Sequence, residues 1–197
     1  MMARFLAPFM SCLLAALVAA CASSPAPKFY TLSRTPAPGA PPSTLSVLVG
    51  PVSVPAAVDL PQIVVSVSPN QVTLDEFNRW ASPLASNISR VVAENLVDLL
   101  GTPRVSQFQQ SLNVDADFRV AVEVQNFEST LGDAAAFSAV WAVRRTRDGR
   151  TETGRTAVRE PPSDKSYDAL AAAHSRALSR MSQDIAAAVR ALARAAP

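Results

Sequence analysis

The feature that most constrains the fold is a long apolar stripe near the carboxyl end of the chain. Between residues 163 and 195, apolar side chains recur every three or four positions, and alanine fills much of the rest. Residues at this spacing lie on one side of a helix, so the pattern predicts an amphipathic helix of about 30 residues. Its apolar stripe consists of Leu170, His174, Leu178, Met181, Ile185, Val189 and Leu192. A face of that length needs a broad apolar surface, and we expect it to pack across a β-sheet.

Alternation of apolar and polar residues predicts the strands of that sheet. Residues 117–127 and 137–147 place apolar side chains at every second position, which is typical of half-buried strands. The Asp148-Gly149 pair then indicates a tight hairpin to a partner strand. Further strands are predicted at residues 28–32, 45–54, 62–67, 72–74 and 151–158.

A second helix is predicted between the two groups of strands. Ser82 can cap its free amides, and Pro83 suits the first helical position. Gly101 and Pro103 indicate its end. Its buried stripe would consist of Leu84, Ile88, Val91, Val92, Leu96 and Leu99. The order of elements is typical of one α/β domain, with a mixed sheet of about five to six strands flanked by two main helices in two or three layers.

The first residues of the chain predict export. Arg4 is followed by an apolar stretch, Phe5 to Ala20, that is too short and too interrupted for a membrane-spanning helix of about 20 residues. A positive start, a short apolar core and small residues before a cut site are the parts of a secretory signal peptide. The small residues here are Val18-Ala19-Ala20, and they end at Cys21.

These residues resemble the lipobox of bacterial lipoproteins. The resemblance implies cleavage before Cys21, a lipid on its thiol and acylation of the new amino terminus. Ala22 resembles the sorting residue of the outer-membrane class, since Asp at that position commonly retains a lipoprotein in the inner membrane. The alternative is an ordinary signal peptide whose cleavage site happens to precede a cysteine. We therefore divide the chain into a leader (1–20), a lipidated tether (21–27) and one domain (28–195).

Composition excludes several classes of function. Cys12 leaves with the leader and Cys21 is the acylation site, so no cysteine remains for a disulfide, a thiol nucleophile or a cysteine metal site. Loss of Arg4 lowers the net charge of +2 by one, and the sequence lacks the clustered charge that nucleic-acid binding needs. Metal-ligand spacings of histidines and carboxylates are absent from the sequence, so we expect no metal and no cofactor.

The sequence does not favour catalysis. His174 is the only histidine, and its place on the apolar stripe favours a structural role, because a catalytic base needs a nucleophile and an orienting acid. Asp75 and Glu76 are adjacent and would point apart in a strand, so a solvated loop is the favoured interpretation. The arginines within residues 144–150 indicate a solvated hairpin tip, and contact with an acidic partner or anionic headgroups is the alternative.

A series of short motifs follows in order along the chain. The motifs are Tyr30-Thr31-Leu32, Gly50-Pro51-Val52, Val54-Pro55, Pro61-Gln62-Ile63-Val64, Arg79-Trp80 and Pro83-Leu84. Together with the lipobox and the alanine-rich terminal helix, this series resembles the ABC-type transport auxiliary lipoprotein family over nearly the whole mature chain. The resemblance implies a mixed sheet flanked by helices, and a periplasmic accessory subunit of a lipid transport system.

Such systems combine an ABC permease and ATPase with MCE-domain proteins that bridge the envelope. The resemblance implies that this chain docks onto the MCE-domain protein, while its lipid holds it at the periplasmic face of the outer membrane of a Gram-negative bacterium. Homo-oligomerisation is left open. The alternatives are a stand-alone lipid carrier with an apolar pocket between helix and sheet, and a hydrolase that pairs His174 with a serine.

The stretch from Gly50 to Leu84 is the first place where we expect the docking surface, or else residues that shape the fold. Its candidates are Gly50, Pro51, Pro55, Pro61, Gln62, Ile63, Arg79, Trp80 and Pro83. The Gly50-Pro51 pair also predicts a bend in its strand, because proline cannot donate to a central ladder.

Overall fold

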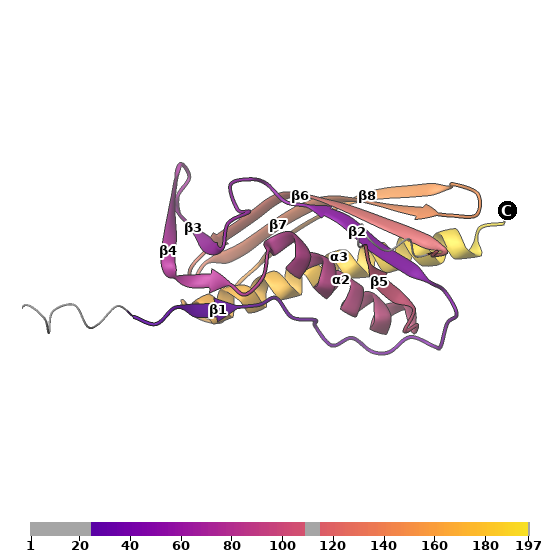
Figure 1. Ribbon diagram of the computed structural model, residues 1–197, viewed down its shortest axis with the longest axis horizontal. Helices are drawn as coiled ribbons and strands as arrows, with labels where there is room; N and C mark the ends of the chain where they lie inside the picture. The colour runs from indigo at the N-terminus through magenta and orange to yellow at the C-terminus, as the bar shows by residue number, and fades with distance from the viewer. Residues whose placement is uncertain (1–24, 109–114, 197) are drawn as a thin grey trace, which may run out of the picture.

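The computed structural model describes residues 25–108 and 115–196, in which eight strands and two helices form one α/β domain (Figure 1). The α/β class is confirmed. The expectations for the leader, for Cys21 and for Ala22 lie outside the described residues. The strands are β1 (Lys28–Tyr30), β2 (Val47–Ser53), β3 (Gln62–Ser68), β4 (Gln71–Trp80), β5 (Val105–Gln107), β6 (Phe118–Thr130), β7 (Ala134–Arg145) and β8 (Thr151–Glu160). The helices are α2 (Leu84–Leu100) and α3 (Tyr167–Arg194).

The strands form two sheets. A five-stranded sheet has the order β5-β2-β6-β7-β8, and a three-stranded sheet has the order β1-β4-β3. In the larger sheet β2 runs parallel to β5 and β6, whereas β6, β7 and β8 are antiparallel, so the predicted mixed sheet is confirmed. The smaller sheet was not predicted as a separate unit. Strand β5 was also not predicted, because a strand of three residues is too short to show an alternating pattern.

Both helices cover one face of the five-stranded sheet (Figure 1). Helix α3 has 28 residues, and at 1.5 Å per residue it is about 42 Å long. It begins at Tyr167, where Ser166 caps it by accepting a hydrogen bond from the amide of Ala169 at 3.1 Å. All seven residues of its predicted stripe are buried. The helix therefore crosses the sheet as the periodicity predicted.

Helix α2 begins at Leu84, one residue later than a cap at Ser82 predicts. Pro83 occupies the N-cap position and makes no side-chain hydrogen bond, so the expectation that Ser82 caps this helix is wrong. Gly101 ends the helix with a φ of 64°, as predicted, and its amide donates to the carbonyl of Val97. An L-residue with a side chain adopts this left-handed conformation only at a cost, which explains the glycine there.

Strand β4 extends well beyond the predicted residues 72–74. Asp75 and Glu76 lie within it rather than in a solvated loop. The strand bends as it passes from the hairpin toward α2, and its pairing with β3 is irregular there (Figure 1). Asp75 accepts hydrogen bonds from the amide of Phe77 at 2.8 Å and from the side chain of Asn78 at 2.7 Å. These bonds hold the bend. They also lower the pKa of Asp75, and the backbone bond from Phe77 is the largest cause.

Side chains from the helices and the larger sheet fill the space between them. Phe137 of β7 and Leu178, Met181 and Ile185 of α3 belong to one hydrophobic core, and all four are at most 2% exposed. Packing of this interior stabilises the domain. The predicted mature chain would have no free cysteine to form a disulfide.

Strand β2 contains the predicted bend. Gly50 has a φ of 126°, and the Gly50–Pro51 peptide bond is cis. The register of β2 against β6 shifts between Val49 and Val52, so the strand changes its path there. A Cβ atom at Gly50 would lie 2.7 Å from the Cβ atom of Phe108, which leaves no space for a side chain.

We predict that Gly50→Ala destabilises the domain by about 1–3 kcal/mol, because alanine would be both strained at this φ and in contact with Phe108. Urea denaturation of the purified protein measures the free energy of unfolding. Gly39→Ala is the control, since nothing lies within 4 Å of that position. Equal free energies for the two variants would contradict the prediction.

Candidate functional site

The predicted acylation site, Cys21, precedes the described residues. Six residues, 22–27, lie between Cys21 and Lys28, where β1 begins. An extended chain spans at most about 25 Å over that distance. Strand β1 lies at one end of the long axis and the carboxyl end of α3 at the other (Figure 1). A lipid on Cys21 would therefore keep the β1 end of the domain close to the membrane.

The described residues contain neither a metal site nor a spanning helix. Within residues 25–108 and 115–196, no group of three histidine, cysteine or acidic side chains could hold a metal ion. In the same ranges, neither helix is long and apolar enough to cross a membrane.

The candidate residues between Gly50 and Leu84 do not form one cluster. Ile63 and Trp80 are buried, at 1% and 6% exposure. The ring of Trp80 meets that of Phe127 edge-on, with 6.1 Å between the ring centroids. These two candidates shape the core, so a docking role rests on the exposed members of the set.

Gln62 and Arg79 are brought together on the surface of the three-stranded sheet. They are partners across β3 and β4, and both bind the carboxylate of Glu76. The amide of Gln62 donates to it at 3.1 Å and 3.2 Å, and the guanidinium of Arg79 donates at 2.7 Å. These bonds lower the pKa of Glu76, and the bond from Gln62 is the largest cause. The cluster presents polar groups of both signs to solvent.

Three of the candidate prolines lie at the ends of elements. The carbonyl of Pro55 accepts a hydrogen bond from the amide of Val58 at 3.0 Å and closes a turn before β3. The carbonyl of Pro61 accepts from the amide of Trp80 at 2.7 Å, which ties the start of β3 to the end of β4. Pro83 is the N-cap of α2. All three direct the path of the backbone.

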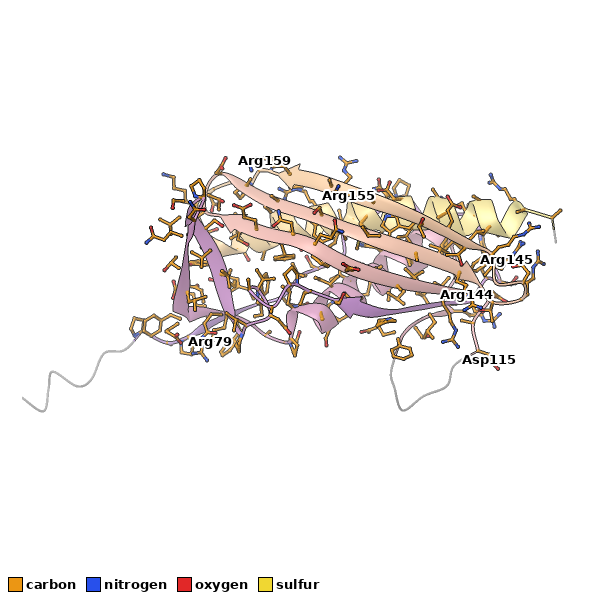
Figure 2. The ribbon with its side chains drawn as sticks, turned by 90° about the horizontal axis from the view of Figure 1, so that it is seen from above. Arg79, Asp115, Arg144, Arg145, Arg155 and Arg159 are labelled. Atoms are coloured by element: carbon orange, nitrogen blue, oxygen red, sulfur yellow. The ribbon has the colours of Figure 1, made fainter. Side chains whose placement is uncertain are left out.

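Pro51 lies on a different surface, beside residues of β6 and β7. Figure 2 shows that no helix covers this face of the five-stranded sheet. A shallow hollow of about 290 Å³ lies on this face and includes Pro51. We call the surface around it the open sheet face. Its residues are Pro51, Ser53, Ala121, Glu123, Val140 and Ala142. Most of these side chains are small, so a partner's backbone can approach the sheet closely.

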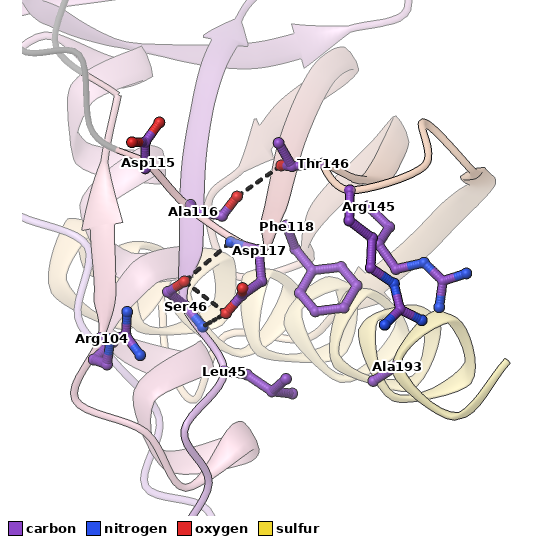
Figure 3. Close-up of a pocket in the computed structure, with 11 residues that line it drawn as sticks. Leu45, Ser46, Arg104, Asp115, Ala116, Asp117, Phe118, Arg145, Thr146 and Ala193 are labelled. Carbon is purple, nitrogen blue, oxygen red and sulfur yellow. Dashed lines mark hydrogen bonds between the residues drawn. The ribbon is translucent and has the colours of Figure 1, made fainter. Parts of the chain in front are cut away.

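A larger hollow, of about 430 Å³, lies at the end of the domain opposite β1 (Figure 3). Ser46 donates to one carboxylate oxygen of Asp117 twice, from its amide at 2.8 Å and from its hydroxyl at 2.7 Å. The hydroxyl bond is the main cause of the lowered pKa of Asp117. Thr146 donates to the carbonyl of Ala116 at 2.6 Å. These polar groups bind one another, so they do not mark a ligand.

Arg145 closes the carboxyl end of α3 beside this hollow. Its guanidinium donates to the carbonyls of Leu192 and Ala195 and to the carboxylate of Asp148, and the residue is 2% exposed. The expectation of a solvated arginine tip is therefore wrong for Arg145. The last carbonyls of a helix lack partners within it, and the β7–β8 hairpin supplies a cation to them. The bond from Arg145 is the largest cause that lowers the pKa of Asp148 to about 2.

His174 pairs with a serine, as the hydrolase alternative requires, but the pair is enclosed. The Nε2 atom of His174 lies 2.8 Å from the hydroxyl of Ser129, and the two residues are 0% and 2% exposed. The imidazole stacks on the ring of Phe127 with 3.8 Å between centroids. Within residues 25–108 and 115–196, the Nδ1 atom has no hydrogen-bond partner, so no acid from these residues orients the ring. A substrate has no access to this pair, and its role is structural.

Comparisons with known proteins identify the family. The family model described as "ABC-type transport auxiliary lipoprotein component" matches residues 30–186. No curated protein matches the chain.

Two solved structures share the fold. Protein XCC0632 from Xanthomonas campestris, described as a DUF330 protein, superposes with a TM-score of 0.67 at 22% identity, over 85% of this chain and 100% of that one. An uncharacterized protein superposes with a TM-score of 0.67 at 21% identity, over 83% of this chain and 99% of that one. At these identities the likeness supports the fold alone.

Burial of His174 predicts a pH-dependent stability. Desolvation lowers its pKa to about 3 in the folded protein, whereas an exposed histidine has the ordinary value of 6.5. Below pH 6.5 the unfolded chain binds a proton that the folded chain does not, so folding loses about 1.4 kcal/mol per pH unit. We predict that the protein loses about 2 kcal/mol more than His174→Gln between pH 7 and pH 5.

Urea denaturation at the two pH values measures this difference. His174→Gln is the reference because it keeps a polar side chain but does not titrate, so the response of the carboxylates cancels in the comparison. Parallel losses in both proteins would show that His174 does not carry the effect.

Proposed function

This chain belongs to the ABC-type transport auxiliary lipoprotein component family, and we propose that it is the outer-membrane-anchored subunit of a lipid transporter that contains an MCE-domain protein. The observation that carries the proposal is the family match, which extends from β1 into α3. An accessory subunit needs an anchor and a protein-binding surface, and no chemistry of its own. The enclosed His174 and Ser129 agree with such a role.

The anchor in this proposal is Cys21. The lipobox predicts lipid chains on this residue, and Ala22 predicts delivery to the outer membrane. A single acyl chain binds a membrane only marginally, whereas the several chains of a processed lipobox cysteine anchor it stably. The short segment to Lys28 then keeps the domain at the periplasmic face of that membrane.

The docking surface in this proposal is the open sheet face. Pro51 was a candidate from the sequence, and the structure surrounds it with Ser53, Ala121 and Ala142. Two features support the choice. The helices leave this face of the sheet uncovered, and its small side chains allow a partner to lie close to the strands (Figure 2). Exposed Arg155 on the adjacent β8 adds positive charge beside it.

In-cell crosslinking tests the partner and the surface together. A photo-crosslinking amino acid at Ser53 should capture an MCE-domain protein, because the side chain is exposed on the open sheet face. The same amino acid at Gln183, which is exposed on α3, is the control and should capture none. Capture from Gln183 alone would overturn the choice of surface. Capture from neither position, with the protein lipidated and folded, would contradict the proposed function.

Lipidation has a matched pair of variants because the chain has two cysteines. We predict that Cys21→Ser abolishes the labelling of the protein by radiolabelled palmitate and leaves it unprocessed. Cys12→Ser should keep full labelling, since residue 12 lies in the leader that is removed. Immunoprecipitation followed by autoradiography gives both results. Labelling of the Cys21→Ser protein would exclude this residue as the acylation site.

A further inference from the structure

Exposed apolar side chains gather at the end of the domain where β1 begins. Seven large apolar side chains stand out as exposed on the described residues, and six of them lie in the three-stranded sheet or just before β3. The six are Phe29, Leu60, Val67, Val72, Leu74 and Phe77. A cluster of this kind on a folded domain marks an interaction site, because scattered single residues are the usual pattern.

The cluster is concentrated at the tip of the β3–β4 hairpin. We call Val67, Val72 and Leu74, with the turn at Pro69-Asn70, the hairpin tip. Their exposures are 61%, 59% and 46%. The fifteen residues from Leu60 to Leu74 contain no charged side chain. Natural exposed hairpins usually carry charges that prevent association, so an uncharged tip indicates a contact with an apolar environment.

Both strands of the hairpin tip contribute exposed apolar side chains. Leu74 pairs with Val64 and Val72 pairs with Ser66, so Val72 and Leu74 point to the same side. Val67 lies where the register of β3 against β4 shifts, and it is exposed whereas Val65 is buried. Strand β3 thus continues past the body of the domain, where the core no longer covers its apolar side chains.

Charges of both signs lie around the uncharged hairpin tip. Lys28 and Lys165 are the two lysines of the chain, and Asp75 and Asp164 lie at the same end of the domain. Lys28 begins β1, and Lys165 lies against the turn that contains Gly132. Tyr167 ties the start of α3 to this end, because its hydroxyl donates to Asp75 at 3.1 Å. Lysine side chains reach from apolar surroundings to phosphate groups, which is typical of residues at a membrane interface.

We infer that the hairpin tip enters the lipid bilayer in which Cys21 is anchored, as a second membrane contact. The inference rests on the proposed anchor, because the chain from Cys21 allows at most about 25 Å between that residue and Lys28 at this end of the domain. Val67, Val72 and Leu74 would lie among the upper acyl chains.

The insertion is shallow. Strand β3 is an edge of the three-stranded sheet, so its outer backbone groups have no partner strand among the described residues. Unpaired backbone groups cannot enter the hydrocarbon core, and interfacial segments reach only about 5–10 Å into the boundary of headgroups and acyl chains. The hairpin tip therefore orients the domain on the membrane rather than anchoring it.

The test uses the full lipidated protein in vesicles of phosphatidylethanolamine and phosphatidylglycerol. Val72→Cys supplies one free thiol for a bimane label, because Cys21 is acylated and Cys12 is removed. Lipids with a doxyl quencher should reduce its fluorescence several-fold, and aqueous iodide should quench it weakly. Thr151→Cys carries the same label on an exposed residue at the far end of β8, and it should show the reverse.

Equal iodide quenching of the two labels would place the hairpin tip in water and overturn the inference. A label at residue 72 that is shielded from both quenchers, in a protein that crosslinks to a second copy, would assign the tip to self-association and overturn it too. Flotation of the vesicles reports the anchor independently. Protein that does not float would contradict the proposed lipidation, whereas protein that floats with a water-exposed tip contradicts only the hairpin contact.

Discussion

The structure depends on the burial of α3 along its whole length. The helix is about 42 Å long, and its apolar stripe packs on β7, β8 and α2. Each end is tied to a different part of the molecule. At the start, Tyr167 binds Asp75 at the bend of β4, and at the end, Arg145 binds the last carbonyls. The position of α3 therefore determines both ends of the domain.

Sequence periodicity predicted the elements that pack on one another and missed those that depend on distant partners. The stripe of α3 and the alternation of β6 and β7 were correct, because burial imposes a repeat that is visible locally. Arg145 stands among similar arginines, and only the register of β7 against the end of α3 decides which one is buried. Asp75 was assigned to a loop for the same reason, since its partner Tyr167 is 92 residues away.

The surfaces were harder to predict than the core. The sequence of an apolar strand does not show whether the rest of the domain covers it. Val67 and Val65 belong to the same apolar run, although Val67 is exposed and Val65 is buried. The uncharged run from Leu60 to Leu74 was the available signal, and it needed the geometry of the hairpin to be understood. The open sheet face could not be predicted either, because its residues come from three strands and only Pro51 stood out in the sequence.

The two proposed contacts would serve different purposes. A lipid anchor alone restricts a domain to a membrane but leaves its orientation free. Every protein that docks onto a freely rotating domain must offset the loss of that rotation. The hairpin tip lies at the end that the anchor brings to the bilayer, so its contact would hold the long axis at a constant tilt. The open sheet face would then be presented to the partner in one direction. The contact with the membrane, rather than binding of the partner, would restrict the rotation of the domain.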